Sequence, residues 1–224
     1  MDKPIIIAID GVSGSGKSTM ARTLAAKYNF MYVDTGAMYR AVTYYAIEKK
    51  YLTEETLLKS QLIEDLDKID ICFGEDGHTL LNGVDIEDKI RGIEVSQGVS
   101  KIATIAEVRS AMVDQQRKMS HSHSVVMDGR DIGTTVFPNA DVKLFVTSSP
   151  EVRARRRHSE LMAKGEAVDY DTILKNITER DYIDSSREVS PLTKAPDAIE
   201  IDNSSMSIEE QNSLLNNIIE KYLS

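Results

Sequence analysis

The chain has little cysteine, no long apolar run and no excess of positive charge. Its one cysteine, Cys72, excludes an internal disulfide and suits a reducing compartment. No apolar run approaches the ~20 residues of a membrane span, and no basic-then-apolar leader precedes Ile5. The net charge of -9 argues against a general affinity for nucleic acid or anionic lipid. We therefore expect a cytoplasmic monomer without a membrane or nucleic-acid partner.

The composition is that of a globular protein. Of the 224 residues, 41% are hydrophobic and 28% are charged. A chain of this length can bury the core of one domain and carry a small insert.

A glycine-rich stretch follows the first apolar run. Residues 5–9 are rich in β-branched side chains and too few for a buried helix, so they predict a central parallel strand. The next residues match the pattern G-x-x-x-x-G-K-[ST] and lead into a helix-compatible segment. Glycines let successive N–H groups point at a phosphate, Lys17 can reach the outer phosphates, and the Ser18 hydroxyl can bind Mg²⁺.

A flexible Gly/Ser turn is the alternative interpretation, but this pattern rarely falls by chance between a strand and a helix. We predict a nucleoside-triphosphate site, and its expected ATP-binding residues are Gly11, Val12, Ser13, Gly14, Ser15, Gly16, Lys17, Ser18 and Thr19.

Short apolar runs alternate with amphipathic segments along the rest of the chain. Strands are predicted over residues 30–33, 124–127, 141–146 and 197–201, and helices over 17–29, 37–50, 53–66, 93–102, 105–119, 150–164, 169–184 and 207–222. Five strands interleaved with helices predict an α/β fold, a three-layer doubly wound parallel sheet.

The pattern changes between residues 69 and 86, where alternating segments are separated by turns. Asn82-Gly83 between extended segments is a strong hairpin signal. We predict an inserted β-rich subdomain over 51–103 within a core of 1–50 and 104–224. A plain surface hairpin without function is the alternative.

Ligands of parallel α/β sheets bind beyond the carboxyl ends of the strands, and polar motifs follow the predicted strands here. After the second strand, Thr35 and Arg40 could hold a second phosphate while Tyr39 packs against a sugar or base. Alternatively, Thr35 is an N-cap and Arg40 a surface arginine. After the third strand, Asp128 is placed to meet Mg²⁺ or its waters, and Asp131 could accept from an amino group. A simple strand-exit turn does not explain the clustered charges.

Arginines follow the fourth strand. Arg153, Arg156 and Arg157 share one side of a helix, as a solvated face or as stabilisers of a transferring phosphoryl group. Further on, Arg180, Asp184 and Arg187 also share a face, where an intrahelical salt-bridge ladder is the alternative.

These residues resemble those of the bacterial cytidylate kinases, a branch of the nucleoside-monophosphate kinase family. The resemblance runs nearly end to end. It rests on the phosphate loop, on DTGAMYR from 34, on DGRDIGT from 128, on RARRR from 153 and on Arg180-Asp181 through Arg187. One departure is Ser18, because many of these kinases have glycine after the lysine. A hydroxyl here makes direct Mg²⁺ binding more plausible.

The resemblance implies a P-loop kinase with an insert that binds the monophosphate and a lid over 153–184. It implies transfer of a phosphoryl group from ATP to CMP or dCMP in pyrimidine nucleotide metabolism. By analogy, the acceptor phosphate would be held by Thr35, Tyr39, Arg40, Arg130 and Arg187; the cytosine edge by Ser100, Arg109 and Asp131; the sugar by Arg180 and Asp184. The residues expected to act in transfer are Lys17, Arg130, Arg153, Arg156 and Arg157.

Physical reasoning agrees, because transfer between two phosphates needs positioning and charge neutralisation rather than a protein nucleophile or a strong base.

Two other hypotheses remain. A nucleotide-dependent switch would usually carry an Asn-Lys-x-Asp segment, which this chain lacks after residue 146. A kinase for another small acceptor, a different nucleotide or a shikimate-like metabolite, is the second, but the second arginine cluster favours a phosphorylated acceptor.

Overall fold

The chain folds into two units. The computed structural model describes residues 3–74, 76–121, 123–163 and 165–223. The first unit comprises the described residues of 1–32 and 122–224, and the second unit those of 33–121. Each unit is described by itself.

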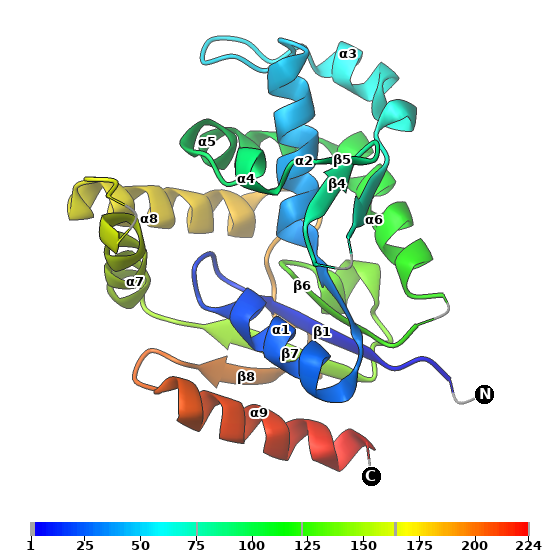
Figure 1. Cartoon of the computed structure of the whole chain (residues 1–224), viewed down its shortest axis with the longest axis vertical. Coiled ribbons are helices and arrows are strands. Elements are labelled where there is room, and N and C mark those ends of the chain that lie inside the picture. The colour runs from blue at the N-terminus through cyan, green and yellow to red at the C-terminus, as the bar shows by residue number, and fades with distance from the viewer. Residues whose placement is uncertain (1–2, 75, 122, 164, 224) are drawn as a thin grey trace. The chain divides into compact units, whose positions relative to one another are not determined.

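The first unit is built on a parallel sheet (Figure 1). The central strand, β1 (Ile6–Gly11), pairs with β6 (Val125–Gly129) on one side and with β7 (Val142–Thr147) on the other. The outer strand β8 (Ile199–Asp202) pairs with β7, and β2 (Met31–Asp34) completes the order β2-β6-β1-β7-β8. The predicted α/β fold with five parallel strands is confirmed.

Two helices share one apolar core with this sheet. The helix α1 (Lys17–Tyr28) follows the glycine-rich loop, and α9 (Ile208–Leu223) closes the chain beside it. Helix α9 begins with a capping box, because the Ser207 hydroxyl accepts from Glu210 N and the Glu210 carboxylate accepts from Ser207 N. The core cluster includes Ile7, Ile9, Met20, Leu24, Leu144, Val146, Leu215 and Ile219.

A second pair of helices has a small core of its own. Helices α7 (Pro150–Ala163) and α8 (Tyr170–Ser186) pack together through Ala154, Leu161, Ile173 and Ile177. Asp169 caps α8 by accepting from Thr172 N at 3.0 Å. These helices contain the arginines of the predicted lid, and closure of this segment stays a prediction.

The second unit is organised around α2 (Thr35–Glu48). Helices α4 (Glu87–Ile90), α5 (Ile93–Ile102) and α6 (Ala106–Met119) pack against it, and Figure 1 shows them beside α2. A short antiparallel sheet, β3 (Ile71–Phe73), β4 (Thr79–Leu81) and β5 (Val84–Asp85), matches the predicted hairpin strands. The predicted insert 51–103 lies within this unit, which also holds α2 and α6; its separate status stays a prediction.

Two predictions of helix starts were wrong. The helix expected from Thr53 begins six residues later, as α3 (Lys59–Glu64) followed by a 3-10 turn (Leu66–Lys68). The Thr53 hydroxyl accepts from Thr56 N at 3.1 Å, as the side chain of an N-cap would, but Thr53 N also donates to Thr56 O. These bonds close a tight turn, so a capping signal alone did not start a helix. The helix expected from Ala37 begins at Thr35, because Asp34 is the N-cap and accepts from Ala37 N at 2.8 Å.

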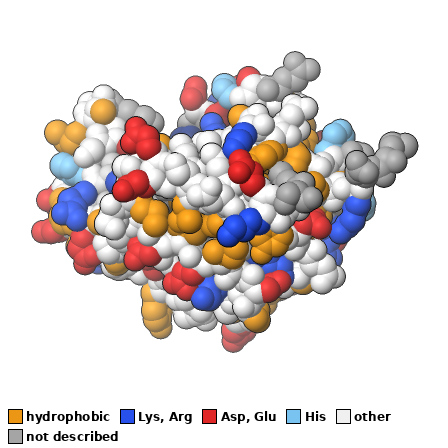
Figure 2. Space-filling view, turned by 90° about the horizontal axis from the view of Figure 1, so that it is seen from below, with side chains coloured by type: hydrophobic (Ala, Val, Ile, Leu, Met, Phe, Trp, Pro, Cys, Tyr) orange, Lys and Arg blue, Asp and Glu red, His pale blue; other side chains and the backbone are white. Residues whose placement is uncertain are grey.

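The surface mixes both signs of charge. On the face shown in Figure 2, acidic and basic side chains are interspersed with hydrophobic ones among the described residues. Within the described ranges, none of the helices combines the length and the hydropathy that a bilayer crossing requires.

The fold makes a testable demand on Gly11. A Cβ at Gly11 would lie 2.0 Å from the carbonyl oxygen of Val146, which is backbone and cannot rotate away. We expect Gly11→Ala to lower the free energy of unfolding by about 3 kcal/mol or more.

The matched control is Gly83→Ala, which also has a positive φ but has nothing within 4 Å of its Cβ. It should cost about 1–2 kcal/mol, the ordinary cost of a left-handed residue. Urea unfolding measures both variants. Equal losses would show that the contact with Val146 carries no extra cost.

Candidate active site

The glycine-rich loop connects β1 to α1 in a conformation that needs its glycines. Gly11, Gly14 and Gly16 have φ values of 144°, 71° and 85°, which L residues with side chains rarely adopt. Gly16 is the N-cap of α1, and no side chain caps the helix there. The helix therefore presents backbone N–H groups and its positive dipole end to the loop, the geometry that binds phosphate.

Lys17 is held inside this loop. Its side chain is buried, and Nζ donates to Val12 O at 2.6 Å and lies 3.5 Å from Ser15 Oγ. Burial and the nearby charge of Arg130 lower the pKa of Lys17 to about 7, against 10.5 ordinarily. A phosphate beside the ammonium would counter both effects, because an anion favours the charged form.

Ser18 and Asp128 meet at the carboxyl end of the sheet, as the strand-end argument anticipated. The Ser18 hydroxyl donates to Asp128 Oδ2 at 3.0 Å, and the Tyr32 hydroxyl donates to Asp128 Oδ1 at 2.8 Å. Asp128 is buried near the end of β6. A hydroxyl and a carboxylate are the oxygen ligands that Mg²⁺ prefers, so this pair fits a magnesium site. Tyr32 was not predicted here, because an aromatic residue in a strand signals packing.

A buried cluster of opposite charges surrounds Arg130. Its Nε donates to Asp184 Oδ2 at 2.8 Å, and Arg187 lies 3.8 Å from Asp184 and 3.9 Å from Asp131. Burial alone would raise the pKa of Asp184, but the arginines around it, Arg130 foremost, together lower the pKa. The structure thus brings together four of the predicted acceptor residues within the first unit.

Arg180 is the fifth predicted acceptor residue of this unit, and it differs from the other four. Its buried Nε has no hydrogen-bond partner among the described residues. Burial and the charge of Arg130 lower the pKa of Arg180. Of the salt-bridge ladder that was the alternative interpretation, the pair between Asp184 and Arg187, the C-cap of α8, is present at 3.8 Å. A buried guanidinium nitrogen without an acceptor favours an anionic ligand.

The three arginines of α7 that were predicted to act in transfer have different contacts. Arg153 is buried and bonded throughout: Nε donates to Ser148 O, Nη1 to Ser13 O at 3.0 Å and Nη2 to Asp181 Oδ2 at 2.6 Å. It thereby ties the loop to both α7 and α8. Its predicted part in transfer stays a prediction, and these contacts describe a positioning role.

Arg156 and Arg157 lie further along α7. Arg156 donates to Asn203 Oδ1 and to Asn203 O at 3.2 and 2.9 Å. Arg157 is 44% exposed and pairs with Glu160 at 3.4 Å, so it has the freedom to reach a ligand.

Asn203 was missed by sequence reasoning. Its Nδ2 donates to Ser15 O at 2.7 Å and to Gln211 Oε1 at 2.9 Å, which joins the phosphate loop to α9. It follows β8, and extending the strand-end argument to the last strand would have found it. With the loop and the α7 arginines it lines a cavity of about 540 Å³, which also includes Met206, Ile208 and Gln211.

The predicted acceptor residues of the second unit lie on α2, α5 and α6. Tyr39 and Arg109 are stacked, with the guanidinium carbon 5.3 Å from the ring centroid. Arg40 Nη1 donates to Ser96 Oγ at 2.8 Å. Four of these residues are buried: Thr35, Tyr39, Ser100 and Arg109.

The interpretation of Thr35 as the N-cap was wrong, because Asp34 is the cap. Asp34 also pairs with Arg91 at 3.1 Å.

Asp10 is a second residue that sequence reasoning missed. Its carboxylate is buried, and it accepts from Ile132 N at 2.8 Å and from Gly133 N at 2.7 Å. Burial raises the pKa of Asp10 to about 6, although the two backbone bonds oppose the shift. Asp10 directly follows the apolar run of residues 5–9, so applying the strand-end argument to the first strand would have found it.

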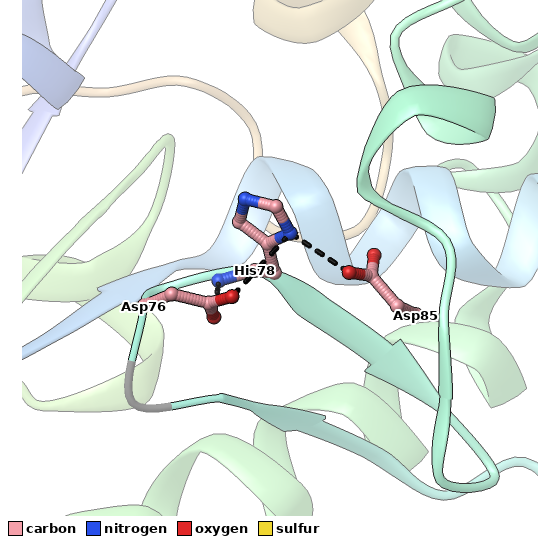
Figure 3. A group of neighbouring side chains, drawn as sticks. All are labelled: Asp76, His78 and Asp85. Atoms are coloured by element: carbon pink, nitrogen blue, oxygen red, sulfur yellow. Dashed lines mark hydrogen bonds and ion pairs between the residues drawn. The ribbon is translucent and has the colours of Figure 1, made fainter.

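One further group of side chains in the described part of the chain has the spacing of metal ligands. Asp76, His78 and Asp85 have ligand atoms within 4.8 Å of one another (Figure 3). His78 Nδ1 lies 2.8 Å from Asp85 Oδ2, and His78 N donates to Asp76 Oδ1 at 2.9 Å. The hydrogen bond to Asp85 raises the pKa of His78. These contacts hold β4 to its neighbours and account for the grouping.

Comparison with known proteins decides the family. The sequence pattern of the family described as cytidylate kinase matches residues 7–223. The chain belongs to the cytidylate kinase family. It is 54% identical over 217 residues to the cytidylate kinase of Flavobacterium johnsoniae, covering 93% of each chain. It is 53% identical over 218 residues to that of Parabacteroides distasonis, covering 95% of each. The chain is therefore a nucleoside-monophosphate kinase of this family.

A solved structure is similar in fold. The crystal structure of an uncharacterized protein from Eubacterium ventriosum has a TM-score of 0.51 and 17% identity, covering 98% of each chain. At this identity the likeness concerns the fold alone.

The raised pKa of Asp10 predicts how stability depends on pH. The native state keeps this proton up to about pH 6, whereas the unfolded chain releases it near 3.8. The free energy of unfolding therefore falls as the pH rises through this window. Asp10→Asn cannot titrate, so the wild type should gain about 1.5 kcal/mol relative to it on moving from about pH 8 to about pH 5.

Urea unfolding of both proteins at the two pH values measures this difference. A constant difference between wild type and variant would mean that Asp10 titrates alike in the native and unfolded states.

Proposed function

We propose that this kinase transfers the γ-phosphoryl group of ATP to CMP or dCMP, with Mg²⁺ as its metal cofactor, and forms CDP or dCDP. One observation carries the proposal for the two nucleotides. The first unit holds both a phosphate loop with a buried lysine and a separate buried arginine cluster, in which Arg180 Nε has no partner among the described residues. Two anionic groups account for two cationic sites.

The donor site is proposed to be the loop from Gly11 to Thr19. Its N–H groups would bind the phosphates of ATP, and Lys17 would contact the outer ones. The cavity beside the loop offers Met206 and Ile208 as apolar contacts for a base. Arg156 and Arg157 line this cavity and are proposed to stabilise the charge that develops during transfer.

The proposed magnesium ligands are Ser18 directly and Asp128, through water or directly. Their contact of 3.0 Å and their oxygen chemistry support this assignment. When bound, Mg²⁺ supplies neutralisation of the charge on the outer phosphates. Tyr32 orients Asp128 through its hydrogen bond to the second carboxylate oxygen.

The acceptor phosphate is proposed to bind Arg130 and Arg187 of the first unit, with Thr35, Tyr39 and Arg40 of the second. Arg180 and Asp184 are proposed to hold the sugar. This phosphate is already an anion when it attacks, so no strong general base is required. Catalysis then consists of positioning two anions that would otherwise repel each other, which is the work of the buried guanidinium groups.

Cytosine is proposed to be recognised by Asp131, Ser100 and Arg109. A carboxylate accepts a charge-assisted hydrogen bond from the amino group of cytosine, which uracil lacks. Asp131 is buried beside Arg187, and uracil would turn a carbonyl oxygen toward this carboxylate where cytosine has its amino group, so two acceptors would face each other. This asymmetry is the physical basis for preferring CMP to UMP.

The remaining expectations rest on composition. A single cysteine and a net charge of -9 support a cytoplasmic location and the absence of a nucleic-acid partner. The monomeric state likewise stays a prediction.

An acceptor panel tests the proposal. A coupled assay of ADP release should give much faster turnover with CMP and dCMP than with UMP, AMP or GMP. Lys17→Ala serves as the control, because it should remove nearly all transfer while circular dichroism stays unchanged. Absence of turnover with CMP, or a preference for a neutral acceptor, would contradict the proposal.

Asp131→Ala should weaken the preference for cytosine. Loss of one charge-assisted hydrogen bond, about 1.5–3 kcal/mol, corresponds to a roughly tenfold to hundredfold fall in the CMP-to-UMP ratio of kcat/KM. Asp141→Ala removes an acidic side chain at the amino end of the same sheet and should leave the ratio unchanged. If Asp131→Ala keeps the wild-type ratio, another group recognises the base.

A further inference from the structure

We propose that Asp10 is a positioning residue for acceptor recognition: its buried carboxylate holds the turn that carries Asp131, and so determines the preference for cytosine. The inference rests on the proposed function, because it assigns to Asp10 an effect transmitted through Asp131. Asp10 touches neither nucleotide in this scheme.

Asp10 lies in β1, which is paired with β6 on one side and with β7 on the other. It stands opposite Gly129 of β6 and opposite Phe145 of β7 in the register of the sheet. The side chain is 4% exposed and both of its oxygens are used, one by Ile132 N and the other by Gly133 N. These are the first two amides after Asp131.

The backbone around Asp131 is held from both directions. On its carbonyl side, Asp131 O accepts from Thr135 N at 2.8 Å and from Val136 N at 3.2 Å. These bonds form a single π-helical turn over Ile132–Val136. The turn has no side-chain cap of its own, and Asp131 is outside helical geometry, with φ -146° and ψ 26°. The Asp10 carboxylate satisfies the two leading N–H groups in place of a cap.

The Asp10 carboxylate packs closely against Gly133 as well as accepting its hydrogen bond. A Cβ at Gly133 would lie 3.3 Å from Asp10 Oδ2 and 3.1 Å from Lys143 Cδ. Little space therefore remains for the turn to shift while the carboxylate stays in place. π-Helical turns are uncommon and often mark functional sites, which supports a role for this turn in setting the direction of Asp131.

Substitution of Asp10 by asparagine tests the inference at about pH 8, where the carboxylate is ionised. The amide has one acceptor oxygen, so one of the two N–H groups loses its bond while the shape is kept. We expect the CMP-to-UMP ratio of kcat/KM to fall about tenfold and KM for CMP to rise, with KM for ATP within about twofold of wild type. The ratio is the decisive readout, because a change in the charge near Lys17 affects both acceptors equally.

Two further variants sharpen the test. Asp141→Asn is the matched control, because Asp141 also accepts a backbone N–H of β1, from Ile6 at 2.9 Å, but at the amino end of the strand. It should leave the ratio unchanged. Gly133→Ala disturbs the same contact from the other side and should lower the ratio as Asp10→Asn does, which covers the case in which Asp10→Asn does not fold.

A double mutant separates action through Asp131 from an independent effect. In an Asp131→Ala background, Asp10→Asn should change the ratio no further, because the group that it positions is gone. Additive losses would overturn the inference, as would an unchanged ratio in folded Asp10→Asn and Gly133→Ala. A wild-type enzyme without preference for CMP would instead contradict the proposed function itself.

Discussion

Buried positive charge at the carboxyl edge of the sheet is the constraint on which the site in the first unit depends. Lys17, Arg153 and Arg187 are each less than a tenth exposed. Taking a cation out of water costs several kcal/mol unless polar partners replace the solvent. The fold therefore surrounds these groups with acceptors: the Val12 carbonyl for Lys17, Asp181 for Arg153, and Asp184 for Arg130 and Arg187.

These acceptors do not fully replace the water around the buried cations, and the groups left short of acceptors indicate what the site binds. Burial and the charge of Arg130 lower the pKa of Lys17, and Arg180 has a buried nitrogen without an acceptor among the described residues. Both defects are relieved by anions. A site that keeps its cations in place and desolvated before the ligand arrives needs little reorganisation during transfer. Holding these cations buried without a full set of acceptors lowers the stability of the protein and leaves the site ready to bind phosphate.

Two buried carboxylates, Asp184 and Asp10, have different roles because their surroundings differ. Asp184 is ionised among arginines, which lower its pKa. Burial raises the pKa of Asp10 to about 6, although its two backbone N–H partners oppose the shift. An aspartate thus serves as a counter-ion at position 184 and as the support of a turn at position 10. Burial together with the nearest charge decides which.

Local patterns were sufficient for the sheet, the phosphate loop and the meeting of Ser18 with Asp128, because strand periodicity, glycine φ and the parallel strand order are short-range or topological properties. The sequence alone also determined the family. The strand-end argument points to Asp10 and Asn203, but the sequence could not show their partners, which lie 122 and 188 residues away. It likewise could not show that Arg153 binds Ser13 and Asp181. Those outcomes were left to tertiary structure, since a buried polar group binds whichever acceptor packing brings within 3 Å.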